Sequence, residues 1–424
     1  MTIKHWISKI NRYRFRNERS LTGGFHGPLS RSLPAIPATR VREKNIKRTV
    51  IDRSFFRGLS VNVGRLRHIL TDGLKIVAPY GCAFSLIVML SGNSVAQYPS
   101  AMSGDPVPRD VRETYEKGLQ YLASTQSEDG SWGEGGYKGP GVTGMAVMTF
   151  LASGEDPNFG IYSSHIRRGL RSIIGSQDSE TGILGGKAGH TSMYHHGFAM
   201  LALAEAYGAV DDRTLWSEVG EERGRSIGES LELAVRGAVT SQKNNKFGGW
   251  RYGPDAKDAD TSVSGAVMVG LLAAKNAGID VPDEAINRGI SYFLSMTGDK
   301  GNVAYSGPSS HGDSMARSSI AALIYAIDKR KDMPKYRAVL QSLTSRLDQS
   351  PPSYPRYTQY YEAQALFQGD PDAWRRWNER LIRELKEEQL DDGQFTGSYG
   401  ATVETSLGLL AMALNYRFLP IYER

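Results

Sequence analysis

Apolar and polar residues between positions 105 and 424 follow two kinds of helical pattern in turn. The first kind is amphipathic: along residues 115–122, apolar side chains recur at helical spacing among polar ones. The second kind is apolar nearly throughout, as along residues 264–275. An amphipathic helix covers a core with one face, whereas a helix that is apolar all round is buried. The pattern therefore predicts that outer helices alternate with inner helices.

A turn rich in glycine and aromatic residues joins each outer segment to its inner segment. The clearest copy is Gln126-Ser-Glu-Asp-Gly-Ser-Trp132, and related turns begin at Gln177, Gln242 and Gln389. The whole unit recurs six times, although its fourth and fifth copies keep little of the turn. Repetition at such a period is typical of folds built from stacked supersecondary units. Six hairpins that close on themselves predict an all-α fold, a single α/α toroid (α6/α6 barrel) over residues 105–424.

The basic charge of the chain belongs to its N-terminal part. Residues 1–75 hold 17 Lys and Arg against 4 Asp and Glu, so the rest of the chain is net negative although the total is +6. The charge therefore gives no support to a nucleic-acid partner, and we expect none. Residues 1–60 are rich in Arg and Pro without a sustained period, which predicts a disordered extension.

Residues 61–96 have the order of regions that is typical of a secretory signal. Basic residues up to Lys75 precede an apolar run through Leu90, and small residues follow up to Ala96. This order predicts export to the periplasm or the medium, with cleavage after Ala96. An uncleaved membrane anchor is the alternative, but the uninterrupted apolar run is shorter than the roughly 20 residues that span a bilayer.

The single cysteine, Cys82, lies within this apolar run, so the exported chain is expected to have none. A chain without a thiol forms no disulfide and offers no thiolate metal ligand and no cysteine nucleophile. His195 and His196 are adjacent in sequence, so on a helix they project about 100° apart and do not form a ready metal-binding pair. We therefore expect neither a metal nor another cofactor.

The Gln126-x-x-x-Gly130-x-Trp132 turn resembles the QW motif of squalene and oxidosqualene cyclases. Further segments, among them Met193-Tyr-His-His-Gly and Gly248-Gly-Trp-Arg-Tyr, make the chain similar to exported bacterial proteins of the prenyltransferase/squalene-oxidase-repeat family. The resemblance implies a terpenoid-cyclase-like toroid whose central cavity binds or converts an isoprenoid or another apolar ligand. The expected partner is thus an apolar small molecule or lipid, with peripheral contact at a membrane surface as a further expectation.

Squalene-type cyclases start their reaction with an acidic D-x-D-D segment. The corresponding stretch here is Lys257-Asp-Ala-Asp-Thr261, so Ala259 stands where those enzymes have the protonating carboxylate. Asp258 and Asp260 are the candidates to replace it as catalytic acids, and Asp260 is alternatively an ordinary helix N-cap. Protein prenyltransferases of the same fold bind zinc through Asp, Cys and His, and the exported chain lacks the cysteine. The sequence therefore leaves open whether the ligand is turned over.

The inner helices have equivalent residues at one position near their start, called here the first-turn column: Thr143, His196, Ser264, Arg317, Tyr361 and Thr405. Six helix N-termini, each with a partial positive charge, would meet at one mouth of the ring, so this column predicts a shared ligand site. His196 in this column is a third catalytic candidate, and a satisfied structural histidine is the alternative. About one turn below, Met148, Met200 and Leu409 are expected to form apolar walls for a tail. The column and the nearby aromatic turns give the predicted ligand-binding residues: Thr143, Tyr194, Trp250, Tyr252, Ser264, Arg317, Tyr357, Tyr361 and Thr405.

The same aromatic mouth also fits another class of function. Aromatic rings stack on sugars, and α6/α6 rings also host enzymes that act on polysaccharides with a pair of carboxylates. Glu205, Glu362 and Glu404 are the acids expected to reach the interior. The alternative is therefore a carbohydrate- or peptide-binding scaffold or a polysaccharide-active enzyme. A closed apolar cavity would favour the isoprenoid, and an open groove with paired carboxylates would favour the carbohydrate.

Overall fold

The computed structural model describes residues 107–185, 191–216, 224–307, 314–351 and 353–422. The predictions for residues 1–60 and 61–96 lie outside this part of the chain. The described chain is built from helices, and its paired strands are the two-residue segments β1 (Gly133–Glu134) and β2 (Tyr137–Lys138). None of the described helices has the length and apolarity needed to cross a membrane. The predicted all-α fold is confirmed.

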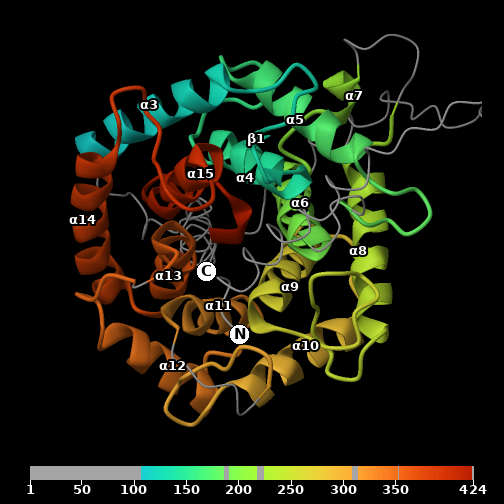
Figure 1. The fold of residues 1–424 in the computed structure, drawn as a ribbon, viewed down its shortest axis with the longest axis vertical. Helices are drawn as coiled ribbons and strands as arrows, with labels where there is room; N and C mark the ends of the chain where they lie inside the picture. The colour runs from blue at the N-terminus through green and yellow to red at the C-terminus, as the bar shows by residue number, and fades with distance from the viewer. Residues whose placement is uncertain (1–106, 186–190, 217–223, 308–313, 352, 423–424) are drawn as a thin grey trace, which may run out of the picture. The chain divides into compact units, whose positions relative to one another are not determined.

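Within the described chain, twelve long helices form two concentric rings (Figure 1). The outer ring consists of α3 (Arg109–Ser124), α5 (Ser163–Gly175), α8 (Ile227–Lys243), α10 (Asp283–Met296), α12 (Pro334–Thr344) and α14 (Pro371–Glu388). The inner ring consists of α4 (Pro140–Leu151), α6 (Ser192–Ala206), α9 (Thr261–Asn276), α11 (Met315–Ile327), α13 (Pro355–Gly369) and α15 (Ala401–Met412). Each inner helix contacts the next, and α15 contacts α4, which closes the ring. The predicted α/α toroid of six hairpins is confirmed.

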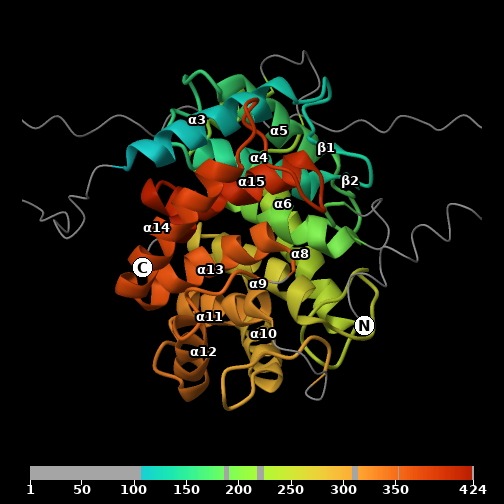
Figure 2. The ribbon, with the colours of Figure 1, turned by 60° about the vertical axis from the view of Figure 1, so that its left-hand side comes forward.

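Burial follows the predicted alternation of outer and inner helices. Figure 2 shows the hairpins from another side, with α12 and α14 outside α11 and α13. The outer helices bury one face and leave the other in solvent, whereas the central residues of every inner helix are buried all round. Val147, Leu203, Met268, Leu323 and Leu410, one from each of five inner helices, are 0% exposed.

The same pair of hydrogen bonds recurs in four glutamine turns and joins neighbouring hairpins. In four turns the glutamine Nε2 donates one hydrogen bond to the carbonyl of the turn glycine and a second to a carbonyl of the next outer helix. The four pairs of acceptors are Gly130 and His165 for Gln126, Gly182 and Ser230 for Gln177, Gly248 and Ala285 for Gln242, and Gly393 and Thr114 for Gln389. The last pair links the sixth hairpin back to the first. The repeated glutamine therefore joins neighbouring hairpins at four of the six junctions around the ring.

The C-terminal segment packs at the end of the ring where the inner helices finish. It contains the short helices η3 (Ala413–Asn415) and η4 (Pro420–Tyr422). The N–H of Ile421 donates to Glu205 Oε2 at 3.2 Å, and the Tyr422 hydroxyl lies 3.5 Å from the Leu410 carbonyl oxygen. Ile421 and Tyr422 are both 4% exposed. This segment closes that end, and the N-terminal ends of the inner helices form the mouth.

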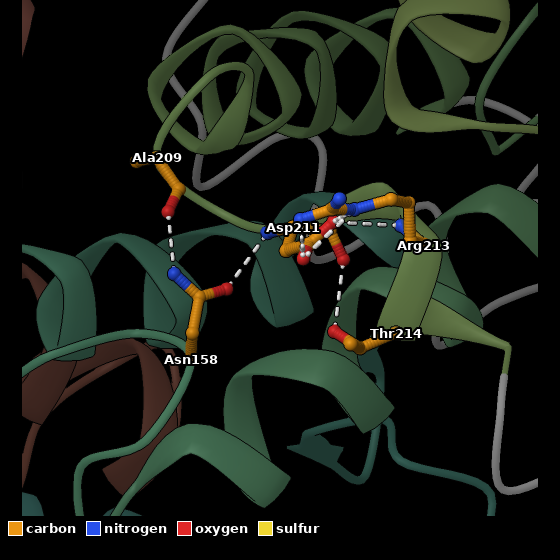
Figure 3. A network of polar contacts seen from close by, with 5 residues as sticks. All are labelled: Asn158, Ala209, Asp211, Arg213 and Thr214. Carbon is orange, nitrogen blue, oxygen red and sulfur yellow. Dashed lines mark hydrogen bonds and ion pairs between the residues drawn. The ribbon is translucent and has the colours of Figure 1, made fainter.

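The connections that follow α4 and α6 are joined by polar contacts (Figure 3). Asn158, in the loop after α4, donates from Nδ2 to the Ala209 carbonyl at 2.9 Å and accepts the Asp211 N–H at 2.7 Å. Asp211 caps the short helix α7 (Asp212–Leu215) and pairs with Arg213 at 2.8 Å. Thr214 Oγ1 donates to the Asp211 carbonyl at 2.9 Å. Two hairpins are therefore joined by one asparagine side chain.

Candidate functional site

Every hairpin places at least one partly exposed tyrosine at the mouth. These residues, called here the mouth tyrosines, lie in the turns or in the first turn of an inner helix: Tyr137, Tyr194, Tyr252, Tyr305, Tyr354, Tyr357 and Tyr399. Three of them, Tyr194, Tyr252 and Tyr357, are among the predicted ligand-binding residues. The structure thus brings these three together at one end of the ring.

Six of the seven mouth tyrosines form two arcs of three residues each, which are linked by ring contacts or by a hydrogen bond between hydroxyl groups. In one arc the Tyr399 ring lies 5.5 Å from the rings of both Tyr137 and Tyr354. In the other, the rings of Tyr194 and Tyr252 are 6.3 Å apart, and the Tyr252 hydroxyl is hydrogen-bonded to that of Tyr305. Such offset and edge-on contacts are the favourable arrangements for aromatic pairs. The two arcs present aromatic faces with hydroxyl groups at their edges.

Below the mouth, the lumen of the ring is filled with side chains. In the inner helices, exposed or partly exposed residues occur only in the first turn and in the last two positions. Phe198, Tyr360 and Tyr361 are 3%, 2% and 1% exposed, with the Phe198 and Tyr360 rings 6.1 Å apart. The accessible surface of the inner ring on this side therefore belongs to the mouth alone, in the part of the chain that the structure describes.

The apolar walls expected below the mouth are part of this packing. Met148, Met200 and Leu409 are 1%, 0% and 0% exposed. Leu409 lies against Gly118 of α3, so its side chain faces the outer ring and not the lumen. The expectation that these residues line a cavity for the tail of a ligand is therefore wrong for Leu409. Met148 and Met200 have almost no accessible surface with which to contact a ligand.

Asp260 lies at the mouth as the N-cap of α9. It is 0% exposed, and its Oδ1 accepts the N–H of Val263 at 2.9 Å, so the predicted capping role is confirmed. Oδ2 has no hydrogen-bond partner among the described residues and lies 3.5 Å from Arg251 Nε, which is the distance of an ion pair. Burial raises the pKa of this carboxyl to about 7, against the opposing effects of the cap and Arg251. Near neutral pH the group can therefore hold or release a proton.

Arg251 connects the acidic and aromatic parts of the mouth. Its guanidinium lies 5.1 Å from the ring centre of Tyr252 and 5.5 Å from that of Tyr305. It also pairs with Asp258 at 3.4 Å, and Asp258 itself is largely in solvent. The sequence pattern does not single out Arg251, although the segment Gly248-Gly-Trp-Arg-Tyr contains it. Its position directly after the turn tryptophan is the signal that could have found it.

The predicted first-turn column has a structural partner that the sequence did not reveal. Four of the six side chains in the column accept the backbone N–H of the turn residue two places after the turn glycine, over 2.8 to 3.1 Å. The pairs are Thr143 with Trp132, His196 with Leu184, Ser264 with Trp250, and Thr405 with Phe395. All four acceptors are at most 1% exposed. They fasten the turns to the inner helices, and a role in ligand binding stays a prediction.

The two histidines are neutral parts of the fold. His196 is 0% exposed, and burial lowers its pKa to about 4. Because Nδ1 accepts the Leu184 N–H, the proton of the neutral ring is on Nε2. Burial likewise lowers the pKa of His195 to about 4, and its Nδ1 accepts the Gly141 N–H at 3.3 Å. Nδ1 of His196 thus has a structural role, whereas Nε2 has no hydrogen-bond partner among the described residues, and the catalytic role stays a prediction.

The remaining predicted ligand-binding residues lie at different depths. Trp250 is 1% exposed, and its Nε1 donates to the Ala238 carbonyl at 2.9 Å. Tyr361 is also 1% exposed and lies beneath Tyr357, with ring centres 5.0 Å apart. Arg317 is partly exposed, and its Nε donates to the Val303 carbonyl at 2.9 Å. Its guanidinium lies 6.0 Å from the Tyr305 ring, so it is the one of these three that reaches the mouth.

The three interior acids are held by different parts of the fold. Glu205 faces the C-terminal segment, as described above. Glu404 accepts the Tyr399 N–H at 3.1 Å, behind the mouth. Glu362 is 0% exposed and faces Arg380 and Trp377 of α14, so it points away from the lumen. Within the described residues, no three His, Cys, Asp or Glu side chains are grouped closely enough to hold a metal ion.

Solved structures of other proteins have a similar fold, among them the following two. One is an inactive variant of the alpha-1,6-mannanase GH76A of Salegentibacter sp. HEL1_6 in complex with alpha-1,6-mannotriose, with a TM-score of 0.52 and 10% identity over 73% of this chain and 99% of the mannanase. The other is the type II terpene cyclase MstE from Scytonema, with a TM-score of 0.50 and 15% identity over 74% of this chain and 100% of the cyclase. At these identities the likeness shows the toroid fold alone. Membership of the prenyltransferase/squalene-oxidase-repeat family stays a prediction.

Comparison of the sequence with curated proteins gives no match. A family model, described as a domain of unknown function (DUF6288), matches residues 112–349. This stretch covers the first four hairpins and the outer helix of the fifth. Because the match spans more than half of the chain, the protein belongs to the DUF6288 family.

Proposed function

We propose that the toroid binds an oligosaccharide at the mouth tyrosines. One observation carries the proposal: the accessible surface of the inner ring at this end is limited to the mouth, and tyrosines from all six hairpins occupy it. A sugar ring has apolar C–H faces and polar edges, and tyrosine has an apolar ring with one polar tip. The two surfaces are therefore complementary.

The polar groups at the mouth support the same ligand class. Binding sites of this kind combine aromatic walls with a few polar groups that fix the orientation of the ligand. Arg251, with its side chain 22% exposed, and Asp258, at 62%, offer donors and acceptors beside Tyr252 and Tyr305. The mannanase complex adds that a toroid of this kind holds a saccharide in that protein.

The isoprenoid proposal, which follows from the resemblance to squalene cyclases, has less support. An isoprenoid chain needs an apolar cavity that is deep enough to cover it. The described inner helices leave no such accessible surface below their first turns. The acid that would start a cyclisation is replaced by Ala259. We therefore place the lipid among the outcomes of the test, together with the proposed peripheral contact with a membrane.

The first prediction concerns the arc formed by Tyr137, Tyr354 and Tyr399. We expect the double variant Tyr354→Ala/Tyr399→Ala to bind oligosaccharides about 10-fold or more weakly than the wild type, because aromatic anchors carry much of the binding energy of a site. Titration calorimetry with alpha-1,6-mannotriose and a panel of other neutral trisaccharides measures the change. Tyr207→Ala is the matched control, since Tyr207 is a 40% exposed tyrosine outside the mouth.

Two outcomes would contradict the proposal. In one, the wild type binds none of the oligosaccharides. In the other, the native protein retains a lipid that native mass spectrometry detects, and the mouth variants release that lipid. Unfolding temperatures of the three proteins, measured by differential scanning calorimetry, separate lost binding from lost folding.

We also propose that the protein is exported, on the basis of its signal-like residues 61–96. The second prediction follows: N-terminal sequencing of the protein recovered from the periplasm or the medium gives Gln97 as the first residue. The control is the variant Ala96→Arg, which places a bulky charge where signal cleavage requires a small residue and is expected to remain uncut. Recovery of residues 1–60 in the exported wild type would contradict the prediction.

A further inference from the structure

A cleft of about 540 Å³ lies where the third glutamine turn, which follows α8, meets the next outer helix, α10 (Figure 1). It is lined by residues 246–248 of the turn and by Glu284, Asn287, Arg288 and Ser291 of α10, and we call it the outer cleft. No mouth tyrosine is among these lining residues. The volume is within the range of roughly 300 to 1,000 Å³ that is usual for small-molecule sites, so the outer cleft is a candidate site separate from the mouth.

The turn that borders the outer cleft is fixed by its own hydrogen bonds. Asn245 is 6% exposed, and its Oδ1 accepts the N–H of Phe247 at 3.0 Å and that of Gly248 at 3.2 Å. A Cβ on Gly248 would lie 2.8 Å from the carbonyl oxygen of Arg288, so the backbone of the turn packs directly against α10. With the backbone held in this way, the Phe247 side chain is 50% exposed and forms an aromatic wall of the cleft.

Two cations line the outer cleft. Arg288 Nη2 donates to the carbonyls of Asn245 at 3.2 Å and Gln242 at 3.5 Å. These bonds hold the guanidinium in place, and its other N–H groups have no acceptor in the described chain. Lys246 Nζ lies 5.4 Å from the centre of the Phe247 ring, so one ligand can contact both the ammonium and the ring. The cleft therefore offers a preformed guanidinium and an ammonium to an anionic group.

The other polar groups of the outer cleft suit hydroxyl groups. Asn287 Oδ1 accepts a hydrogen bond from Arg330 at 3.1 Å, which leaves the amide N–H groups of Asn287 as donors. Glu284 and Ser291 are exposed and offer acceptors. Although Glu284 is four residues before Arg288, no ion pair within the described chain joins them. The lining thus carries two cations and one carboxylate, which suits a ligand with one negative charge and several hydroxyl groups.

We infer that the outer cleft binds a uronate, the acidic sugar unit of an oligosaccharide. The carboxylate of the uronate accepts hydrogen bonds from Lys246 and Arg288. The C–H face of the sugar ring packs against Phe247, and hydroxyl groups of the ring donate to Glu284. The inference goes beyond the proposed function because it adds a second site, and it takes from that function only the ligand class, a saccharide.

Other anions fit the outer cleft less well. The chain of a fatty acid would stay largely in water, because the lining residues other than Gly248 and Arg288 are exposed. A phosphate dianion would bring its second negative charge close to the Glu284 carboxylate. Both ligands would also leave the hydroxyl-binding groups of the cleft without partners.

The third prediction tests the outer cleft with Phe247→Ala and with the double variant Lys246→Gln/Arg288→Gln. We expect the wild type to bind a trimer of galacturonate, guluronate or mannuronate about 10-fold more tightly than the neutral methyl ester of the same trimer, because only the free carboxylate pairs with the two cations. We expect each variant to bind the best trimer about 10-fold more weakly than the wild type does. Titration calorimetry at low salt measures these affinities.

The salt dependence separates the contribution of charge from that of the aromatic ring. Raising the salt from about 20 to about 300 mM should weaken uronate binding by the wild type and by Phe247→Ala to the same extent, because ions screen exposed charges. The affinity of the double variant should change little. Differential scanning calorimetry shows whether the variants are folded, and Phe247→Ala, which removes an exposed side chain, is expected to keep the wild-type unfolding temperature.

Matched controls remove a similar side chain outside the outer cleft. Lys243 is an exposed lysine at the end of α8, and Phe159 is an 89% exposed phenylalanine in the loop after α4. Lys243→Gln and Phe159→Ala are expected to bind the uronate trimer as the wild type does. The mouth variant Tyr354→Ala/Tyr399→Ala should bind it unchanged as well.

The outcomes distinguish the outer cleft from the mouth. A wild type that binds no uronate trimer, or that binds trimer and ester equally, overturns the inference and leaves neutral binding at the mouth unaffected. If the mouth variant loses uronate binding while both cleft variants keep it, the uronate is held at the mouth and the inference is again overturned. If neutral trisaccharides do not bind but the cleft variants lose uronate binding, the proposed function fails and the outer cleft stands.

Discussion

Replacing Gly393 by alanine is expected to destabilise the toroid by about 3 kcal/mol or more. Gly393 has φ +90° in the turn that closes the ring, and a Cβ there would lie 2.2 Å from the Lys117 carbonyl oxygen of α3. The clash is with backbone, so no side-chain rotation relieves it. The same turn carries the Gln389 bonds to Thr114 and to Gly393 itself, which the strained turn would weaken. Urea unfolding followed by circular dichroism measures the loss.

The matched control for this substitution is Gly278→Ala. Gly278 also has φ +90°, but a Cβ there meets nothing within 4 Å. The stability loss of Gly278→Ala therefore reports only the cost of placing alanine in the left-handed conformation, which is roughly 1 kcal/mol. Alanine also stiffens the unfolded chain, and this effect reduces the loss. The difference between the two variants is the cost of the contact between the sixth and first hairpins. Equal stability losses in both would show that this close approach does not matter to the ring.

The hairpin repeat is readable from the sequence because its pieces are local. The glutamine, the turn glycine and the aromatic residue lie within seven positions, as in Gln126 to Trp132. The glutamine makes the same hydrogen bonds in several copies. The inner helices are recognisable because they lack a polar face. Both patterns come from residues that are close together in the sequence. The six hairpins and the closure of the ring can therefore be predicted without knowing how the helices pack.

The direction in which the side chains of the first-turn column point cannot be predicted in this way. A residue in that turn faces either the mouth or the preceding glycine turn, depending on how the helix is rotated about its axis. In the structure Thr143, Ser264 and Thr405 face the turns, whereas Tyr194 and Tyr357, at neighbouring positions on the inner helices, reach the mouth. Packing between hairpins sets this rotation. The repeat predicts a column of equivalent positions, but what four of these positions share is a hydrogen bond to the preceding turn.

The surroundings of the buried acids depend on the same long-range packing. Glu362 occupies a column of mostly small residues, with Gly144, Gly197 and Gly265 at the equivalent positions. Its fifth hairpin lacks the glutamine turn, and its carboxylate lies between α13 and α14 near Arg380 and the Trp377 indole. Neither carboxylate oxygen of Glu362 has a hydrogen-bond partner in the described chain, and the Trp377 indole N–H has none either. A carboxyl in such a place favours its neutral form.

The variant Glu362→Gln is therefore expected to gain stability over the wild type as the pH rises. Burial is the main cause that raises the pKa of Glu362 to about 7 from its ordinary value near 4.5. Because the folded-state pKa is raised, the contribution of this group to stability is complete below pH 4.5 and is lost as the pH rises through 7. The variant has no proton to lose. The difference in unfolding free energy should grow by about 3 kcal/mol between pH 4.5 and pH 8, in favour of the variant.

Urea unfolding of both proteins at five pH values across this range measures that difference. His195 and His196, with pKa values lowered to about 4, act in the opposite direction, since their contribution is lost as the pH falls below 6.5. That effect is common to both proteins and cancels in the difference. Glu387→Gln is the control, because Glu387 is an exposed carboxylate on the same helix α14. If the stability difference between Glu362→Gln and the wild type is independent of pH, the charged carboxylate of Glu362 is already stabilised in the folded protein. Bound water inside the fifth hairpin would then be the hydrogen-bond partner of the carboxylate.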